Sequence, residues 1–498
     1  MNDIQSLDDP QRTSASPPPF EVQEEPAVRF NERFVVFSLL AALLFSWPLL
    51  VFGSPSYIQD SAAYFKGGRV AVSYAQDRLR GSEVTAPIPP SLNLQSAQPG
   101  QDVVKEATGV RSITYSVVAY LLSAPRATLI LLAFTQALAA GAVTITTLGV
   151  FGGLPTRRTI TVLILLAAAT TVAPVCFLVI PDIFAGLLIA CFVLLTSVQD
   201  RLSRGVRLLC VGIAAFAVTA HASHIPIAAG MTLLGLGWTA LQRVHKVKFA
   251  RGTWIWIVAP LLLGGITVMA LNRIAFGETS LASKRFPFAL ARSVDDGPGR
   301  WYLEKHCPEL KYTICAVYPH GLPAGGAIEF LWGPDGVTKR ATPAQLDQIR
   351  SEESAIVLAA AREYPGYQAK TFAINFGRQL IYFRPYPFVE RMSFDGRGMP
   401  QLVPAPPHDE QVLDVVYLLT AISAAVGMVW FGWVFFESPS LRPVIALVVL
   451  GILGNVVTCV VLSAVAHRYE ARVIWLIPLF ALALSGANRG RAPDGARR

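Results

Sequence analysis

The chain has 498 residues, of which 53% are hydrophobic and only 15% are charged, and its mean hydropathy is +0.47. Soluble domains carry about a quarter charged residues, so this composition excludes an ordinary soluble protein and indicates a polytopic membrane protein. The net charge of +9 comes from arginines that lie between apolar runs and in the C-terminal tail, which argues against a nucleic-acid-binding surface.

Apolar runs close to the roughly 20 residues that cross a bilayer recur along the chain. We predict an all-α polytopic fold with about ten transmembrane helices, at residues 34–53, 127–151, 159–180, 183–199, 206–222, 225–242, 253–272, 412–435, 442–466 and 473–487. The chain is thereby divided into a disordered cytoplasmic leader (1–33), an N-terminal transmembrane module (34–272), a periplasmic loop domain (273–411), C-terminal transmembrane helices (412–487) and a basic cytoplasmic tail (488–498).

The basic residues predict the orientation of these spans, because Lys and Arg gather on the cytoplasmic side of membrane proteins. With both termini inside, one side receives Arg29, Arg33, Arg157, Arg158, Arg201, Arg204, Arg207, Arg243, Lys246, Lys248, Arg251, Arg442, Arg489, Arg491, Arg497 and Arg498. Among the short turns on the other side, only the last carries basic residues near a helix end, at Arg468 and Arg472.

Two long segments then face outside. The first outer loop, 54–126, contains a Pro/Gln/Ser-rich stretch and ends in a short apolar helix after Arg111, which is expected to lie in the membrane interface. The second is the α-rich segment 273–411. Thr342-Pro343 predicts a helix start there, Pro365 ends that helix, and an amphipathic helix from Tyr367 to Tyr382 is expected to lean on the membrane. Cys307 and Cys315 face an oxidising compartment in this topology and are predicted to form a disulfide.

Four groups of polar residues lie at the outer ends of the predicted spans. Asp60 follows the first span, Asp182 occupies a turn, His221 and His224 mark a helix end, and the run His467-Arg-Tyr-Glu-Ala-Arg472 precedes the last span. Each has an ordinary structural interpretation: a solvated loop residue, a helix cap, a polar helix end or a snorkelling interfacial anchor. Their placement on one membrane face is what favours a functional interpretation.

This arrangement resembles the GT-C class of integral-membrane glycosyltransferases, similar to the bacterial aminoarabinose and mannosyl transferases. The resemblance rests on Asp60-Ser-Ala-Ala-Tyr64 after the first span, on Arg111-Ser-Ile-Thr-Tyr115 closing the first outer loop, and on an acidic residue, Asp182, in a second outer turn. It also rests on the large late outer segment and on Arg468-Tyr469 followed by Pro478. The chain departs from many such proteins in having Ser61 where a second acidic residue follows the first.

The resemblance implies an all-α transferase that moves a sugar from a polyprenyl-phosphate donor to a glycolipid or polysaccharide acceptor on the periplasmic face of the bacterial inner membrane. Asp60 is suited to act as general base, with Asp182 as a second catalytic candidate. Cations would stabilise the phosphate leaving group; the candidates are Arg468, Arg472 and Arg111, with Arg126 as a further one. Substrate-binding candidates are Tyr64, Tyr115, Tyr469, His221 and His224. Asp60 and Asp182 are also candidate ligands for a divalent cation, Mg²⁺ or Mn²⁺, and Asp182 could instead orient an arginine.

Two other kinds of protein remain open. A polysaccharide polymerase or O-antigen ligase would also have a large outer loop and outer arginines, without an early loop aspartate. A lipid-linked-glycan flippase or transporter would carry charged residues near mid-membrane, whereas the predicted spans contain almost none.

Overall fold

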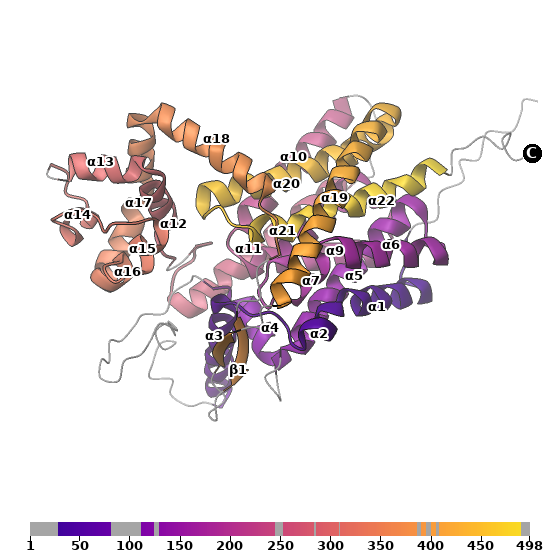
Figure 1. The fold of residues 1–498 in the computed structure, drawn as a ribbon, viewed down its shortest axis with the longest axis horizontal. Helices are drawn as coiled ribbons and strands as arrows, with labels where there is room; N and C mark the ends of the chain where they lie inside the picture. The colour runs from indigo at the N-terminus through magenta and orange to yellow at the C-terminus, as the bar shows by residue number, and fades with distance from the viewer. Residues whose placement is uncertain are drawn as a thin grey trace, which may run out of the picture.

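The computed structural model describes residues 28–80, 111–123, 129–244, 252–282, 285–307, 309–385, 390–394, 400–404 and 408–489. Within these residues the chain forms a bundle of apolar helices and a separate group of external helices beside one end of the bundle (Figure 1). Most of the predicted leader, the Pro/Gln/Ser-rich part of the first loop, Arg126 and most of the predicted tail lie outside the described residues.

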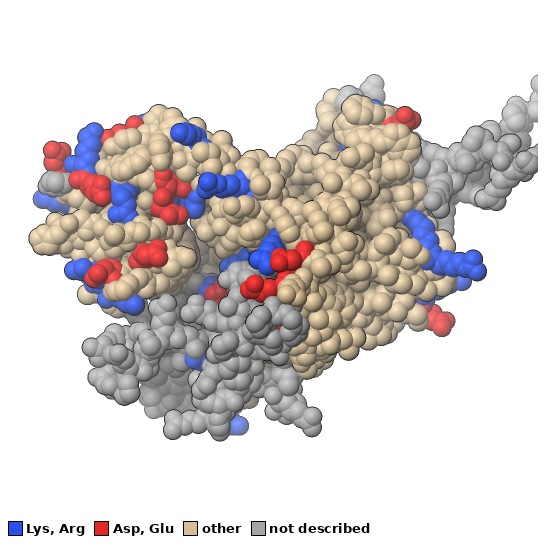
Figure 2. Space-filling view, in the orientation of Figure 1, with Lys and Arg blue, Asp and Glu red and all other residues tan. Residues whose placement is uncertain are grey.

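The bundle is built around α8, in which every residue from Ile183 to Thr196 is buried. The bundle consists of α1 (Glu32–Phe45), α2 (Trp47–Phe52), α5 (Ile130–Gly152), α6 (Thr156–Ala169), α7 (Val172–Phe177), α8 (Ile183–Ser197), the 3-10 turn η1 (Gln199–Arg201), α9 (Arg204–Ala220), α10 (His224–Val244), α11 (Thr253–Phe276), α19 (His408–Glu437), the 3-10 turn η2 (Pro439–Leu441), α20 (Arg442–Leu462), α21 (Arg468–Ile474) and α22 (Leu476–Arg489). One continuous aliphatic and aromatic core joins these helices. Figure 2 shows few charged side chains on the visible face of the bundle, as expected of a surface in contact with lipid.

The protein is therefore membrane-embedded and mainly helical, and in the described part of the chain seven helices are long and apolar enough to cross a bilayer. Three of the ten predicted spans, 159–180, 183–199 and 206–222, correspond to shorter helices. The first of them is broken between α6 and α7, where the Thr170 hydroxyl accepts a hydrogen bond from the Val172 amide at 3.3 Å. Such side-chain bonds to nearby backbone groups compete with the helical pattern.

The beginning of the last predicted span differs from the expected one. The span was predicted to start at 473, but α21 begins at Arg468, so two arginines and Glu470 belong to the helical segment rather than to a turn. The first turns of this segment thus carry charged residues that the predicted span, beginning at 473, left out.

The first outer loop is also more ordered than expected. A helix that the sequence analysis did not predict, α3 (Gln59–Leu79), carries Asp60 in its first turn and packs along α4 (Ile113–Ser123), the short apolar helix expected after Arg111. The two helices approach closely at Gly68, where an added Cβ would lie 1.9 Å from the Ser116 carbonyl oxygen.

The external helices have a hydrophobic core of their own. They are α12 (Phe288–Asp296), α13 (Pro298–His306), α14 (Thr313–Val317), α15 (Ala327–Trp332), α16 (Val337–Arg340), α17 (Pro343–Glu363) and α18 (Pro365–Ile381). Thr342 caps α17 as predicted, because its hydroxyl accepts from the Gln345 amide at 3.3 Å. Cys307 and Cys315 are joined by a disulfide that closes the turn between α13 and α14.

The described residues include a short antiparallel hairpin. Strand β1 (Glu390–Phe394) pairs with β2 (Pro400–Pro404) between the external helices and α19. Apart from this small hairpin, the structure is consistent with the predicted all-α membrane protein.

The contact between α3 and α4 gives a test of the fold. We expect Gly68→Ala to lower the apparent melting temperature of the purified protein, because the new methyl group cannot fit against the Ser116 carbonyl. Overpacking of this kind costs about 1–3 kcal/mol.

Gly67→Ala is the matched control, since its Cβ would lie 3.4 Å from the Ser116 hydroxyl. It should be neutral or stabilise the protein by up to about 1 kcal/mol through its better helix propensity. Equal melting temperatures for the two variants would contradict the close approach of α3 to α4.

Candidate active site

Asp60 is held between two guanidinium groups. Its Oδ1 forms an ion pair with Arg111, just before α4, and its Oδ2 lies 3.3 Å from Nη1 of Arg468, the first residue of α21. The three side chains are partly exposed, at 24% for Asp60, 30% for Arg111 and 17% for Arg468. The structure thus brings three predicted site residues together from segments more than 50 and more than 400 residues apart in sequence.

The backbone before α3 fixes the position of Asp60. Ser56 pairs with the segment after α7: its amide donates to Phe177 O at 2.8 Å, and its carbonyl accepts from Val179 at 3.0 Å. Ser61 is buried, and its hydroxyl accepts from the Ile58 amide at 3.1 Å at the start of α3. Ser61, noted as a departure from many GT-C proteins, therefore starts the helix that carries Asp60.

Two of the predicted tyrosines pack beside Arg111: Tyr64 contacts it directly, and Tyr115 contacts Tyr64. The Arg111 guanidinium lies over the Tyr64 ring at 5.7 Å, and Tyr64 meets Tyr115 edge to face at 4.9 Å. The Tyr115 hydroxyl donates to Gln136 Oε1 at 2.9 Å, and the Gln136 amide donates to Cys176 O at 2.7 Å. Burial raises the pKa of Tyr64 well above that of an exposed phenol, so its hydroxyl stays neutral even with Arg111 nearby.

Arg472 lies deeper and is completely buried. Its guanidinium donates to Asn455 Oδ1 at 2.7 and 3.0 Å, to the Ser223 hydroxyl at 3.3 Å and to Asp182 Oδ1 at 3.4 Å. This differs from the expectation that Arg472 binds the donor phosphate, because no part of its side chain reaches the surface. Asp182 is buried as well, and its carboxylate pairs with Arg472, which fits the interpretation that it orients an arginine.

Tyr469 connects the two arginines of α21. Its ring lies 4.9 Å from the Arg468 guanidinium carbon and 5.2 Å from that of Arg472. Its hydroxyl accepts from Arg468 at 3.2 Å and lies 2.9 Å from the Ser463 hydroxyl. Tyr469, expected to bind substrate, therefore orients Arg468.

The two predicted histidines occupy different environments. His224 is fully buried, and its Nδ1 lies 2.7 Å from Ala217 O. His221 is partly exposed, and its Nδ1 lies 2.8 Å from the hydroxyl of Ser223, the residue that also contacts Arg472. Of the two, only His221 can meet a molecule at the surface.

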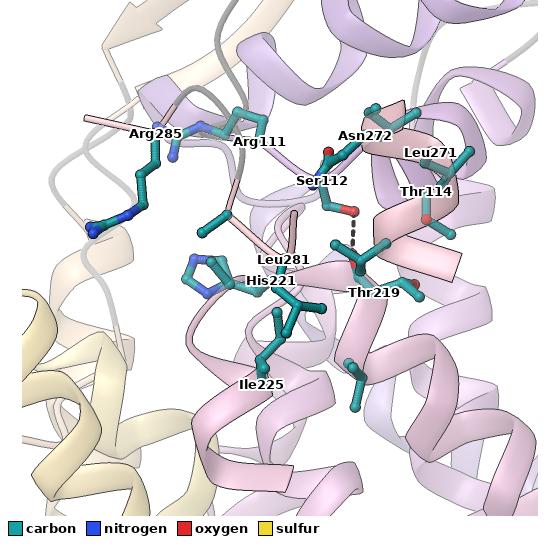
Figure 3. A pocket seen from close by; sticks show the side chains of 15 residues that line it. Arg111, Ser112, Thr114, Thr219, His221, Ile225, Leu271, Asn272, Leu281 and Arg285 are labelled. Atoms are coloured by element: carbon teal, nitrogen blue, oxygen red, sulfur yellow. Dashed lines mark hydrogen bonds between the residues drawn. The ribbon is translucent and has the colours of Figure 1, made fainter. Parts of the chain in front are cut away.

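A small cleft of about 70 Å³ lies beside the Asp60 site. Arg111, His221 and Arg285 lie toward one end of it, and apolar residues of α9, α10 and α11 form much of its wall, among them Val218, Ile225, Val268 and Leu271 (Figure 3). The Ser112 hydroxyl donates to Thr219 O at 2.6 Å and joins α4 to the end of α9 along this wall. The cleft therefore combines cationic groups with an apolar interior.

The turn before Arg468 is held by the external helix α18. Gln379, fully buried, accepts from the Ala466 amide at 2.9 Å and donates to its carbonyl at 3.0 Å. Tyr382 stacks on His467 at 4.5 Å, and the Arg384 amide donates to His467 Nδ1 at 3.3 Å. Burial and the Arg384 charge lower the pKa of His467, which keeps Nδ1 available as an acceptor at neutral pH.

Sequence reasoning missed Gln379, Asn455 and Gln136. Asn455 and Gln136 are polar residues inside apolar runs, a signal that was available, since such residues in membrane helices face other helices. Gln379 gave no such signal, because polar residues are common on an amphipathic helix.

The described residues do not provide a metal site of the usual kind. No three His, Cys, Asp or Glu side chains gather there in positions that could hold one ion. Asp60 and Asp182, the candidate ligands for Mg²⁺ or Mn²⁺, are each paired with arginine. Each of these carboxylates is thus paired with a cationic side chain, and no step is assigned to a divalent cation.

Comparison of the chain with protein-family models, with curated proteins and with solved structures finds no match.

The buried cluster predicts unequal effects of two substitutions. Arg472→Gln should destabilise the protein by about 3–5 kcal/mol, because it leaves the Asp182 carboxylate buried without a cation. The measurement is the apparent melting temperature in detergent.

Glu470→Gln is the control on the same helix. Glu470 is equally buried but has no cation within ion-pair distance among the described residues, and it accepts only from Asn455 at 3.3 Å. Its replacement should leave the melting temperature unchanged or raise it. A loss as large as that of Arg472→Gln would show that Glu470 carries a necessary charge.

The contact with α18 makes a second prediction. Gln379→Ala should increase hydrogen exchange in the peptide that contains Ala466, because that amide loses its acceptor. Asn375→Ala, one turn earlier on α18, should leave this peptide protected, since Asn375 bonds to Asp296 instead. Unchanged exchange in the Gln379 variant would mean that other contacts hold the turn.

Proposed function

We propose that the protein is a membrane glycosyltransferase of GT-C type, which moves a sugar from a polyprenyl-phosphate donor to a hydroxyl of a glycolipid or polysaccharide. The observation that supports this most is the meeting of Asp60, Arg111 and Arg468 at the edge of a cleft with apolar walls. A lipid-linked phosphate sugar needs a carboxylate for the acceptor, cations for the phosphate and an apolar surface for the lipid.

In the proposed reaction Asp60 takes the proton of the acceptor hydroxyl as its oxygen attacks the anomeric carbon. The bond between that carbon and the phosphate oxygen breaks, and its electron pair stays on the phosphate. Arg468 and Arg111 stabilise the charge that develops there. The Asp60 carboxylate also favours the oxocarbenium character of the sugar in the transition state.

Without substrate, both guanidiniums are paired with Asp60. The anionic phosphodiester of the donor competes for the same N–H groups, since arginine binds phosphate oxygens with paired N–H groups. Donor binding would in this way draw Arg111 and Arg468 toward the phosphate and release the Asp60 oxygens for the acceptor. Tyr64 and Tyr469 limit the movement, because each contacts one of the guanidiniums by its ring.

The carrier chain would lie along the apolar wall of the cleft, with His221 near the sugar or phosphate. By the distribution of arginines, this site would face the periplasm of a bacterial inner membrane, with both termini in the cytoplasm.

A lipid-linked-glycan flippase is the second candidate, and one observation favours it. Arg472, Asp182 and Glu470 are buried in the bundle, and ionisable residues within membrane proteins commonly mark a transport path. A flippase would move the lipid without cleaving the sugar–phosphate bond.

The test is sugar release from a labelled polyprenyl-phosphate-sugar mixture with crude acceptor lipids. Asp60→Asn should lower turnover by about 10²–10⁴-fold, the usual contribution of a general base, without changing the melting temperature. Asp77→Asn, an exposed aspartate at the other end of α3, should leave turnover unchanged.

Equal turnover in wild type and Asp60→Asn would remove Asp60 from the chemistry. Translocation of the labelled lipid across vesicles by wild type, with no sugar release, would replace the transferase by the flippase.

A further inference from the structure

A helix of a soluble domain is expected to bury apolar side chains and expose polar ones. In α18 this pattern is reversed. Tyr367, Ile374 and Ile381 are exposed by 44%, 45% and 61%. They are spaced at seven-residue intervals, which places them along one face of the helix. The residues that α18 buries are polar: Asn375 donates to Asp296 Oδ1 at 3.1 Å, and Gln379 binds the backbone of Ala466. Within this face Tyr367 packs edge to face on Trp301 of α13 at 4.5 Å, whereas Ile374 and Ile381, nearer the bundle, stay largely exposed.

This face is continuous with a membrane helix. The Ile381 carbonyl lies 3.5 Å from the Tyr417 hydroxyl, and the Phe383 and Tyr417 rings lie 5.0 Å apart. Tyr417 belongs to α19, one of the helices able to cross a bilayer. Next to it, Val415 and Leu418 are exposed by 57% and 59%, as lipid-facing residues are.

The charges of α18 fit the surface of a bilayer. The helix carries two basic residues, Lys370 and Arg378, both exposed, and its sequence contains no Asp or Glu. A helix with an apolar face and basic flanks, low in acidic residues, is typical of one that lies at the boundary between head groups and acyl chains. Figure 1 shows α18 running from the external helices toward α20, so its C-terminal half lies beside the bundle.

We infer that the Ile374–Ile381 face of α18 is a membrane-docking surface whose partner is a phospholipid leaflet on the Asp60 side. The apolar side chains lie among the lipids, and Lys370 and Arg378 contact lipid phosphates. This inference does not depend on the proposed reaction. It gives the external helices one fixed attachment to the bilayer, through α18. The opposite face of the same helix holds the turn before Arg468.

The test uses the full-length protein in nanodiscs that contain a mixture of zwitterionic and anionic phospholipids. Ile374→Cys and Ile381→Cys are spin-labelled one at a time, and collision with oxygen is compared with collision with a water-soluble nickel chelate. The four free cysteines of the described residues are buried, which favours selective labelling. The control is Ile328→Cys on α15, which is exposed by 68% and lies on the external helices.

We expect the oxygen-to-nickel ratio at positions 374 and 381 to exceed that at position 328 severalfold. Ratios equal to that at 328 would place the face in water and overturn the inference. An immobile label that neither reagent reaches would overturn it as well, because the face would then be covered by protein, such as a second copy of the chain.

The basic residues are tested in the same system. Lys370→Gln/Arg378→Gln should lower the ratio at position 374 in anionic nanodiscs and leave it unchanged in purely zwitterionic ones. No change in either membrane would overturn the contact with anionic lipid phosphates.

Discussion

The buried guanidinium of Arg472 is the constraint on which the rest of the site depends. An arginine enclosed in a membrane bundle must find a counter-ion and hydrogen-bond acceptors inside the protein. Arg472 finds them on α20 at Asn455, before α8 at Asp182 and between α9 and α10 at Ser223. Three separate parts of the bundle are thereby fixed to α21. Because Arg468 begins the same helix, its position opposite Asp60 follows from contacts made four residues later in the chain.

Much of this arrangement could be predicted from the sequence, and there are physical reasons why the remaining parts could not. Apolar runs located the helices, and the Thr342-Pro343 signal located the start of α17. Three predicted spans correspond to shorter helices, and in one of them two threonines interrupt a run that reads as continuous. The start of the last helix was placed too late, because charged residues were assumed to lie outside the membrane helices. A charged side chain can lie within such a helix when another side chain of the protein pairs with it. When that partner comes from a distant segment, no local sequence pattern reveals the pair.

The sequence is enough to select the residues of the candidate site, but it does not assign a role to each of them. Asp60, Arg111 and Arg468 could be selected by their place at helix ends on one membrane face. The same criterion selected Arg472 and Asp182, and the structure pairs these two with each other below the surface. The two sets differ in exposure. Arg472 and Asp182 are buried and stabilise the bundle. Asp60, Arg111 and Arg468 are partly exposed, so their oxygen and nitrogen atoms are within reach of a bound molecule. Burial depends on the packing of all the helices, so composition and spacing do not reveal it.

The external helices contact the two residues that directly precede Arg468. Gln379 and Tyr382 hold Ala466 and His467, the two residues before Arg468, while Asn375, one turn before Gln379, joins α18 to Asp296 of α12. A shift of α18 relative to the bundle would therefore move the Arg468 backbone, whereas Arg472, held by the bundle itself, would resist. The position of Arg468 is set from both sides, by the membrane helices through α21 and by the external helices through α18. Two independent supports of one cation are what a site needs when that cation must exchange a carboxylate for an incoming phosphate without losing its orientation.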